Sequence, residues 1–121
     1  MDIIMEGKER LYNSSQEVKE TINRYFNSID DFYNYAMQLS HDQYVSYKMN
    51  GVFDNTKLEE LKSFLEFAGI DLWLANELVE EVSADYEENL FINNIQPSFG
   101  DDWKEKFEEI EKTIDSLLQN Y

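Results

Sequence analysis

The chain has 121 residues, of which 42% are hydrophobic and 15% aromatic, so it holds enough apolar material for one domain with a buried core. Its 26 acids against 10 bases give a net charge of −16, which disfavours direct binding to nucleic acid or to an anionic membrane surface. The absence of cysteine excludes disulfides, thiolate zinc sites and a cysteine nucleophile, and it fits a reducing compartment.

The first strong helix signal lies at Ser14 and Glu17, which have the spacing of a capping box. Hydrophobic residues then follow at steps of three and four, a pattern that predicts one long helix reaching about Leu39. The dozen residues before Ser14 are expected to form one or two further helical turns.

A short helix is predicted next, because Ser40 and Gln43 repeat the capping spacing. Gly51 is expected to end it in a left-handed turn. His41, the single histidine of the chain, would then lie in its first turn.

Three capping positions organise the rest of the chain. Thr56 begins a helix that Gly69 ends, Asp71 caps the next helix, and Asp101 or Asp102 caps the last one after a loop with proline and glycine. We therefore predict an all-α fold over the whole chain, a single compact bundle of five to six helices with little or no strand. Roughly two-thirds or more of the residues should be helical, well above the usual share.

The stretch ELVEEVSADYEE, residues 77–88, contains six acids and no base, and no base occurs anywhere between Lys62 and Lys104. On a helix its hydrophobic residues gather on one side, and its acids are expected to share the solvent side, where like charges cost a few tenths of a kcal/mol per pair. The last predicted helix interleaves lysines among its acids and avoids this cost. The predicted acidic residues are Glu77, Glu80, Glu81, Asp85, Glu87 and Glu88.

Two explanations fit such a helix. In the first, the acids serve only as solvated charge that keeps a hydrophobic-rich domain soluble. Alternatively, they imitate nucleic acid, because duplex DNA carries one negative charge per about 1.7 Å of axis and a rigid acidic helix presents a comparable field. In size, charge and helix content the chain is similar to small phage and mobile-element proteins that block restriction enzymes, CRISPR nucleases or uracil-DNA glycosylase, although no family motif carries that similarity.

The sequence lacks the residue types that the common catalytic and metal sites need. A di-iron bundle or a zinc site requires more than the one histidine, His41. A histidine phosphotransfer domain has a Lys-Gly pair shortly after its histidine, whereas Lys48 follows seven residues on and Gly51 ten residues on. No glycine-rich phosphate loop or calcium loop is present. We therefore expect no enzymatic activity, no cofactor and no metal.

Some aromatic residues fall outside the predicted core. Trp73 projects toward the acidic side of its helix, where it either covers a neighbouring helix end or serves as a binding hot spot. The apolar residues between Phe91 and Phe99 either fill the bundle or contact a partner. Trp73, Asp101 and Asp102 join the acids of residues 77–88 as predicted partner-binding residues.

The sequence thus predicts a non-enzymatic inhibitor that binds a basic nuclease or another nucleic-acid-binding protein by DNA mimicry, in the manner of phage or mobile-element anti-restriction and anti-CRISPR proteins. An immunity protein that neutralises a nuclease toxin is the main alternative, and an acidic adaptor or virion component is a third. Because no signal-peptide pattern or spanning stretch is seen, we expect a cytoplasmic location, in the host cell if a phage encodes the protein. Monomer and homodimer both stay open.

Overall fold

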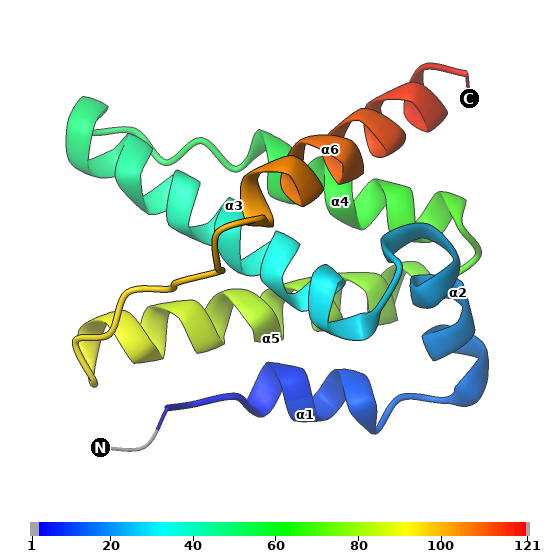
Figure 1. Ribbon diagram of the computed structural model, residues 1–121, viewed down its shortest axis with the longest axis horizontal. Helices are drawn as coiled ribbons and strands as arrows, with labels where there is room; N and C mark the ends of the chain where they lie inside the picture. The colour runs from blue at the N-terminus through cyan, green and yellow to red at the C-terminus, as the bar shows by residue number, and fades with distance from the viewer. Residues whose placement is uncertain (1–2, 121) are drawn as a thin grey trace.

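Six α-helices and their connections make up the computed structural model, which describes residues 3–120 (Figure 1). Helices account for 75% of it and no strand occurs among these residues, so the predicted all-α bundle of five to six helices is confirmed. None of the helices in residues 3–120 is long and apolar enough to cross a membrane. The helices are α1 (Glu6–Tyr12), α2 (Gln16–Phe26), α3 (Ile29–Asn50), α4 (Thr56–Phe67), α5 (Leu72–Phe91) and α6 (Trp103–Gln119).

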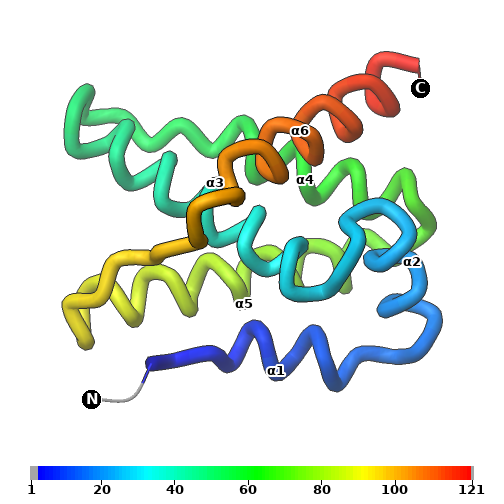
Figure 2. Tube along the Cα trace, in the orientation of Figure 1, coloured from blue at the N-terminus to red at the C-terminus, as the bar shows by residue number. Residues whose placement is uncertain are grey.

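Helix α5 is the centre of the arrangement, because α1, α3 and α4 all pack against it. In Figure 1, α1 runs along the lower side of α5, α3 crosses the middle of the molecule, and α6 lies in front of α4. The tube in Figure 2 shows that α3 and α5 both end at the left of the molecule, the side on which the described part of the chain also begins.

The core forms where the apolar stripes of the helices meet. Phe26 of α2 lies at its aromatic centre, with ring centroids 5.0 Å from Phe32 of α3 and 5.9 Å from Phe64 of α4, both edge to face. All three rings are buried. The apolar side of α5 is buried too, and it consists of Ala75, Leu78, Val79, Val82, Tyr86 and Leu90.

The prediction of one helix from Ser14 to about Leu39 is wrong, because the chain breaks between α2 and α3. Asn27 adopts a positive φ of 69°, and the Ser28 side chain accepts the Asp31 N–H at 3.0 Å and so caps α3. Helix α2 is itself capped by Ser15. The apolar spacing continues across the break because both helices bury their stripes in the same core.

The predicted separate helix after Ser40 is also wrong, because α3 runs through this position without interruption. The Ser40 hydroxyl donates to the Ala36 carbonyl at 3.0 Å and lies 2.9 Å from the Ser83 hydroxyl, so it caps nothing. His41 lies in the middle of α3 rather than in a first turn. Gly51 ends the helix with φ 73°, as predicted.

The later helices begin near the predicted positions. The Asp71 carboxylate accepts the backbone N–H of Trp73 at 3.2 Å and caps α5, which confirms that prediction. Asp102 precedes α6, although its side chain forms no cap hydrogen bond. Helix α4 begins at Thr56, and the left-handed Gly69, φ 105°, lies just past its end.

Candidate partner-binding face of α5

The outer side of α5 carries five glutamates and no base. The helix has 20 residues and therefore spans about 30 Å. The glutamates recur at steps of three, four and seven, the spacings that place side chains on one side of a helix, and each is exposed or half-exposed. Their predicted position on the solvent side is confirmed. We call them the acidic face, which consists of Glu77, Glu80, Glu81, Glu87 and Glu88.

Two bases from other helices reach the acidic face. The Nε of Arg10 in α1 lies 3.6 Å from the Glu77 carboxylate and 3.9 Å from that of Glu81. The Nζ of Lys62 in α4 lies 3.4 Å from the Glu80 carboxylate. Although the sequence has no base between Lys62 and Lys104, two bases from other helices therefore contact α5. The pairs made by Arg10 are more than a third exposed on both sides, and surface ion pairs of this kind contribute at most about 1 kcal/mol.

The acidic face nevertheless keeps a strong negative charge. Within residues 3–120, no ion pair involves Glu87 or Glu88. Glu6 and Glu9 of α1 add two more acids nearby, because they line a groove of about 290 Å³ that Glu88 also lines. By the same criterion Lys48 is a third base here, because it lines a pocket with Glu87, so seven acids face three bases in this region.

Glu81 lies at the border between the acidic face and the bundle. Its Oε2 atom is buried and accepts no hydrogen bond from the described residues, with the Arg10 guanidinium at 3.9 Å. Burial raises the pKa of Glu81, and the charge of Glu77 raises it further, while Arg10 acts in the opposite direction. Glu81 therefore takes up a proton more readily than a free glutamate.

Asp85 does not belong to the acidic face, and its predicted position on the solvent side is wrong. It is only 2% exposed, and its Oδ2 atom accepts hydrogen bonds from the Gly7 N–H and the Tyr33 hydroxyl, both at 2.8 Å. Burial and the hydrogen bond to Asp85 raise the pKa of Tyr33, which keeps that hydroxyl protonated as a donor. Asp85 follows Leu78 by seven residues, or two turns, so the sequence does contain the signal for its inward position.

Asn89, one turn after Asp85, is a second buried polar residue that the sequence analysis missed. Its side-chain amide donates to the Ile4 carbonyl at 2.8 Å, and its side-chain oxygen accepts the Ile4 N–H at 2.8 Å. Asp85 and Asn89 thus hold the N-terminal segment and α1 against α5. These contacts fix Glu6, Glu9 and Arg10 beside the acidic face.

Two exposed aromatic residues mark the ends of the acidic face. Trp73 is 82% exposed and Phe91 is 67% exposed. They are 18 positions apart, which is five turns of 3.6 residues, so both lie on the same side of α5 and about 27 Å apart along its axis. The Trp73 side chain forms no ring contact or hydrogen bond within residues 3–120, so it does not cover a neighbouring helix end.

The segment after α5 divides between core and surface. Ile92 is exposed, whereas the Phe99 ring packs 5.5 Å from Trp103 against the core. Ile95 is half-buried, and its backbone N–H donates to the Asn89 carbonyl at 2.9 Å. Part of the segment therefore fills the bundle, as one of the two alternatives predicts, and a partner contact of its exposed part stays a prediction.

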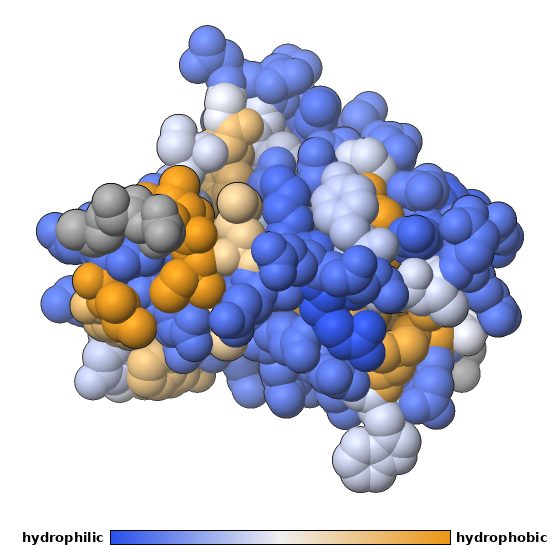
Figure 3. All heavy atoms as spheres, turned by 90° about the horizontal axis from the view of Figure 1, so that it is seen from below, coloured by the Kyte–Doolittle hydropathy of each residue, from blue (hydrophilic) through white to orange (hydrophobic). Residues whose placement is uncertain are grey.

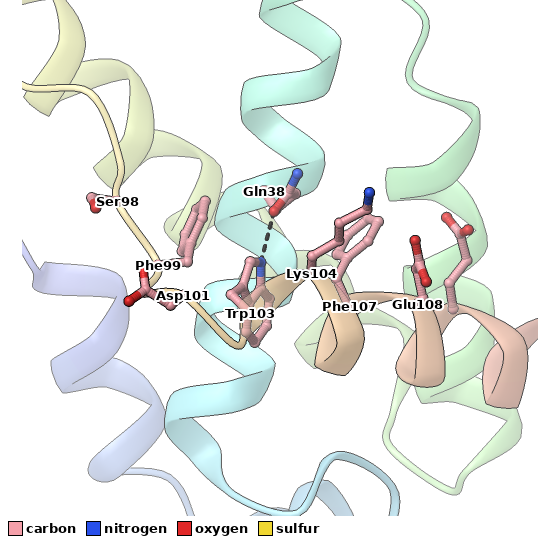
Figure 4. A pocket seen from close by; sticks show the side chains of 10 residues that line it. Gln38, Ser98, Phe99, Asp101, Trp103, Lys104, Phe107 and Glu108 are labelled. Atoms are coloured by element: carbon pink, nitrogen blue, oxygen red, sulfur yellow. Dashed lines mark hydrogen bonds between the residues drawn. The ribbon is translucent and has the colours of Figure 1, made fainter.

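Asp101 and Asp102 lie apart from the acidic face. Asp101 lines a pocket of about 620 Å³ between α3 and the start of α6, and Asp102 lies 3.9 Å from the Lys106 ammonium. Figure 4 shows this pocket, in which the Trp103 indole donates to the Gln38 side chain at 2.7 Å. No residue of α5 lines it, so the structure does not join these two aspartates to the other predicted partner-binding residues.

The acidic face borders a shallow depression that is open to solvent. Seen from below, hydrophilic residues cover the centre of the molecule, while hydrophobic residues gather at its left edge, the end at which α5 stops, and in a second group toward the lower right (Figure 3). The depression has a volume of about 500 Å³ and is lined by Trp73, Asn76, Glu77, Glu80, Glu81 and Ala84.

None of the described residues forms a metal-binding group of three or more histidine, cysteine or acidic side chains. His41 lies in α3 with its Nδ1 atom 3.0 Å from the Tyr86 hydroxyl and its ring edge to face with Tyr86. Both of these contacts belong to the packing of α3 on α5. The outer side of α5, by contrast, presents charge and two aromatic rings to solvent.

No family model matches this sequence, and comparison with curated proteins and with solved structures gives no match either.

Proposed function

We propose that this protein is a non-enzymatic inhibitor that binds a basic, nucleic-acid-handling protein by placing the acidic face in that protein's nucleic-acid channel. The proposed class is a phage or mobile-element anti-defence protein of anti-restriction or anti-CRISPR type. Its proposed target is a basic nuclease in the host cytoplasm.

The charge density of the acidic face carries this proposal. Five carboxylates fall between Glu77 and Glu88, and these eleven steps along a helix cover about 16.5 Å. The mean spacing between successive carboxylates is about 4.1 Å along the axis, comparable to the 3.4 Å between charges on a single strand of duplex DNA. A channel whose lysine and arginine side chains are spaced to bind phosphates can therefore bind the row of carboxylates on α5.

Rigidity supports the same proposal. The acids lie on a 20-residue helix that is packed on its inner side by α1, α3 and α4, so little ordering is needed when a partner binds. Opposite charge on the partner would steer association, and this steering weakens as salt screens it. Inhibition would follow from occupancy of the channel, with no bond made or broken.

Competition with nucleic acid tests the proposal. The full chain, immobilised, is exposed to a bacterial lysate, the recovered proteins are identified, and each is purified and bound again in isolation. A basic nuclease or polymerase should be recovered, and excess duplex DNA or RNA should displace it. A triple reversal of Glu77, Glu80 and Glu88 to lysine should abolish most of the binding.

The matched control reverses Glu105, Glu108 and Glu109 on α6, which changes the net charge by the same amount. This variant should bind nearly as well as the original chain. If nucleic acid leaves the complex intact, the proposal fails, and an interface such as that of an immunity protein on its toxin becomes the better account.

A further inference from the structure

The C-terminal part of α3 lies at the left of Figure 1, and exposed apolar residues are frequent in it and in the loop that follows; we call these residues the patch. Five of the thirteen exposed large hydrophobic residues lie between residues 45 and 53, so they are concentrated rather than scattered. Phe91 at the end of α5 adjoins them, since its ring centroid is 5.9 Å from that of Tyr44.

Aromatic rings form the walls of a pocket in this patch. Tyr47 and Phe53 stack with centroids 4.2 Å apart and an interplanar angle of 8°. Tyr44 stands edge on to Tyr86 at 6.3 Å and to Phe91. We call this the aromatic pocket, and its lining is Ser40, Gln43, Tyr44, Tyr47, Lys48, Phe53, Tyr86, Glu87 and Phe91.

The size of the aromatic pocket limits what it can hold. Its volume is about 220 Å³. This exceeds the roughly 150 Å³ of an apolar cavity that holds a benzene ring, yet it lies below the roughly 300–1,000 Å³ of pockets for drug-sized ligands and cofactors. The pocket therefore suits one large apolar side chain.

The aromatic pocket also adjoins the acidic face. Glu87 belongs to both, and Phe91 lies on the same side of α5 as Trp73. A bound segment can thus place its apolar side chain between the rings while its neighbouring residues run along the glutamates. A second copy of this chain is a poor occupant, because each copy carries a net charge of −16.

We propose that the aromatic pocket receives an aromatic or aliphatic side chain from a basic segment of the partner protein, whose lysines or arginines lie along the acidic face. The basic character of this partner rests on the proposed function. The two surfaces then act differently: the acidic face speeds association, and the buried apolar anchor slows dissociation.

A pair of peptides tests this inference on the full chain. About 27 Å from Phe91 to Trp73 corresponds to about eight extended residues. The probe is a fluorescein-labelled decapeptide with phenylalanine near one end and lysine at alternate positions, and its partner has alanine in place of phenylalanine. At equal charge, the phenylalanine peptide should bind about tenfold tighter or more by fluorescence anisotropy.

Two exposed residues of the patch give matched variants. Phe53, 58% exposed, lines the aromatic pocket, whereas Met49, 79% exposed, does not. The change Phe53→Ser should remove the preference for the phenylalanine peptide, and Met49→Ser should keep it. Circular dichroism checks that both variants fold, as expected for exposed positions.

Several results would overturn the inference. These are equal affinities for the two peptides, no binding of either peptide at low salt, or equal effects of Phe53→Ser and Met49→Ser. A dimer in sedimentation velocity that Phe53→Ser abolishes and Met49→Ser preserves would also overturn it, since a second copy would then occupy the pocket. Failure of nucleic acid to compete for the natural partner would instead count against the proposed function and leave the peptide preference unchanged.

Discussion

Helices α5 and α6 carry the same kinds of residue in opposite settings. Each has a tryptophan in its first turn, Trp73 in α5 and Trp103 in α6. Trp103 is only 5% exposed and its indole hydrogen-bonds to Gln38, whereas Trp73 is 82% exposed. A large ring left in solvent gives up the stabilisation that burial provides, so its position needs a reason other than packing.

The charges of the two helices differ in the same way. Helix α6 carries three lysines among its acids, and Lys57 of α4 lies within 4 Å of both Glu111 and Asp115. Helix α5 has no base of its own and depends on Arg10 and Lys62 from elsewhere. The pattern on α6 is what solubility and packing require. The pattern on α5 adds repulsion without improving the core, and for this reason we propose that the partner binds there.

The two tryptophans provide the largest test of this comparison. The change Trp103→Ala should lower the free energy of unfolding by about 3–5 kcal/mol, because it empties a buried aromatic site. The change Trp73→Ala should lower it by less than about 0.5 kcal/mol. Urea denaturation measures both. Similar losses in the two variants would mean that Trp73 packs within the fold and is not free for a partner.

A second test concerns the inner boundary of the acidic face. The change Asp85→Ala should cost about 2–4 kcal/mol, since it leaves the Gly7 N–H and the Tyr33 hydroxyl without their acceptor. The change Glu88→Ala on the outer side should have almost no effect. Urea denaturation again gives both values. If Asp85→Ala left the free energy of unfolding unchanged, Asp85 would not hold α1 against α5.

The smallest expected effect is on pH dependence. The pKa values of Glu81 and Asp42 are raised, chiefly by burial, so the folded state binds protons more readily than the unfolded chain. Stability should therefore rise as the pH falls from 8 through the raised pKa of Glu81 toward its ordinary value of 4.5. At low salt, the melting temperature should rise slightly as the pH is lowered from 8 to 5.

The isosteric change Glu81→Gln isolates this effect. It should raise the melting temperature at pH 8 and flatten its dependence on pH, while Glu108→Gln on α6 should do neither. A melting temperature that climbs steadily from pH 5 to pH 8 in the original chain would be opposite to the expected sign.

The sequence predicted the beginning or end of a helix correctly where a single residue determines it. The Asp71 cap and the left-handed Gly51 are of this kind. The break at Asn27 was missed because the apolar spacing continues across it, although Ser28 with Asp31 repeats the spacing of a cap. Ser40 was misassigned because its hydroxyl bonds back within the helix, a choice that its neighbours in space decide.

In the candidate site, too, local sequence patterns predicted some features, and others depend on packing between distant residues. The helical period predicted the five glutamates of the acidic face, and a stricter use of that period would have placed Asp85 inside. The sequence alone did not predict contacts between residues that are far apart in the chain. Arg10 and Lys62 approach α5 only through the packing of α1 and α4, and the aromatic pocket joins residues of α3 and α5 with Phe53 from the loop between α3 and α4.

The most direct test of the acidic face is the rate of association with a recovered basic partner, measured by surface plasmon resonance at several salt concentrations. Reversal of Glu77, Glu80 and Glu88 to lysine should slow association about tenfold or more at low salt, and the difference should shrink toward 1 M salt, where screening acts within about 3 Å. Reversal of Glu105, Glu108 and Glu109 on α6 should change the rate far less. Equal effects of the two triple reversals, or an effect on α5 that does not depend on salt, would contradict the account.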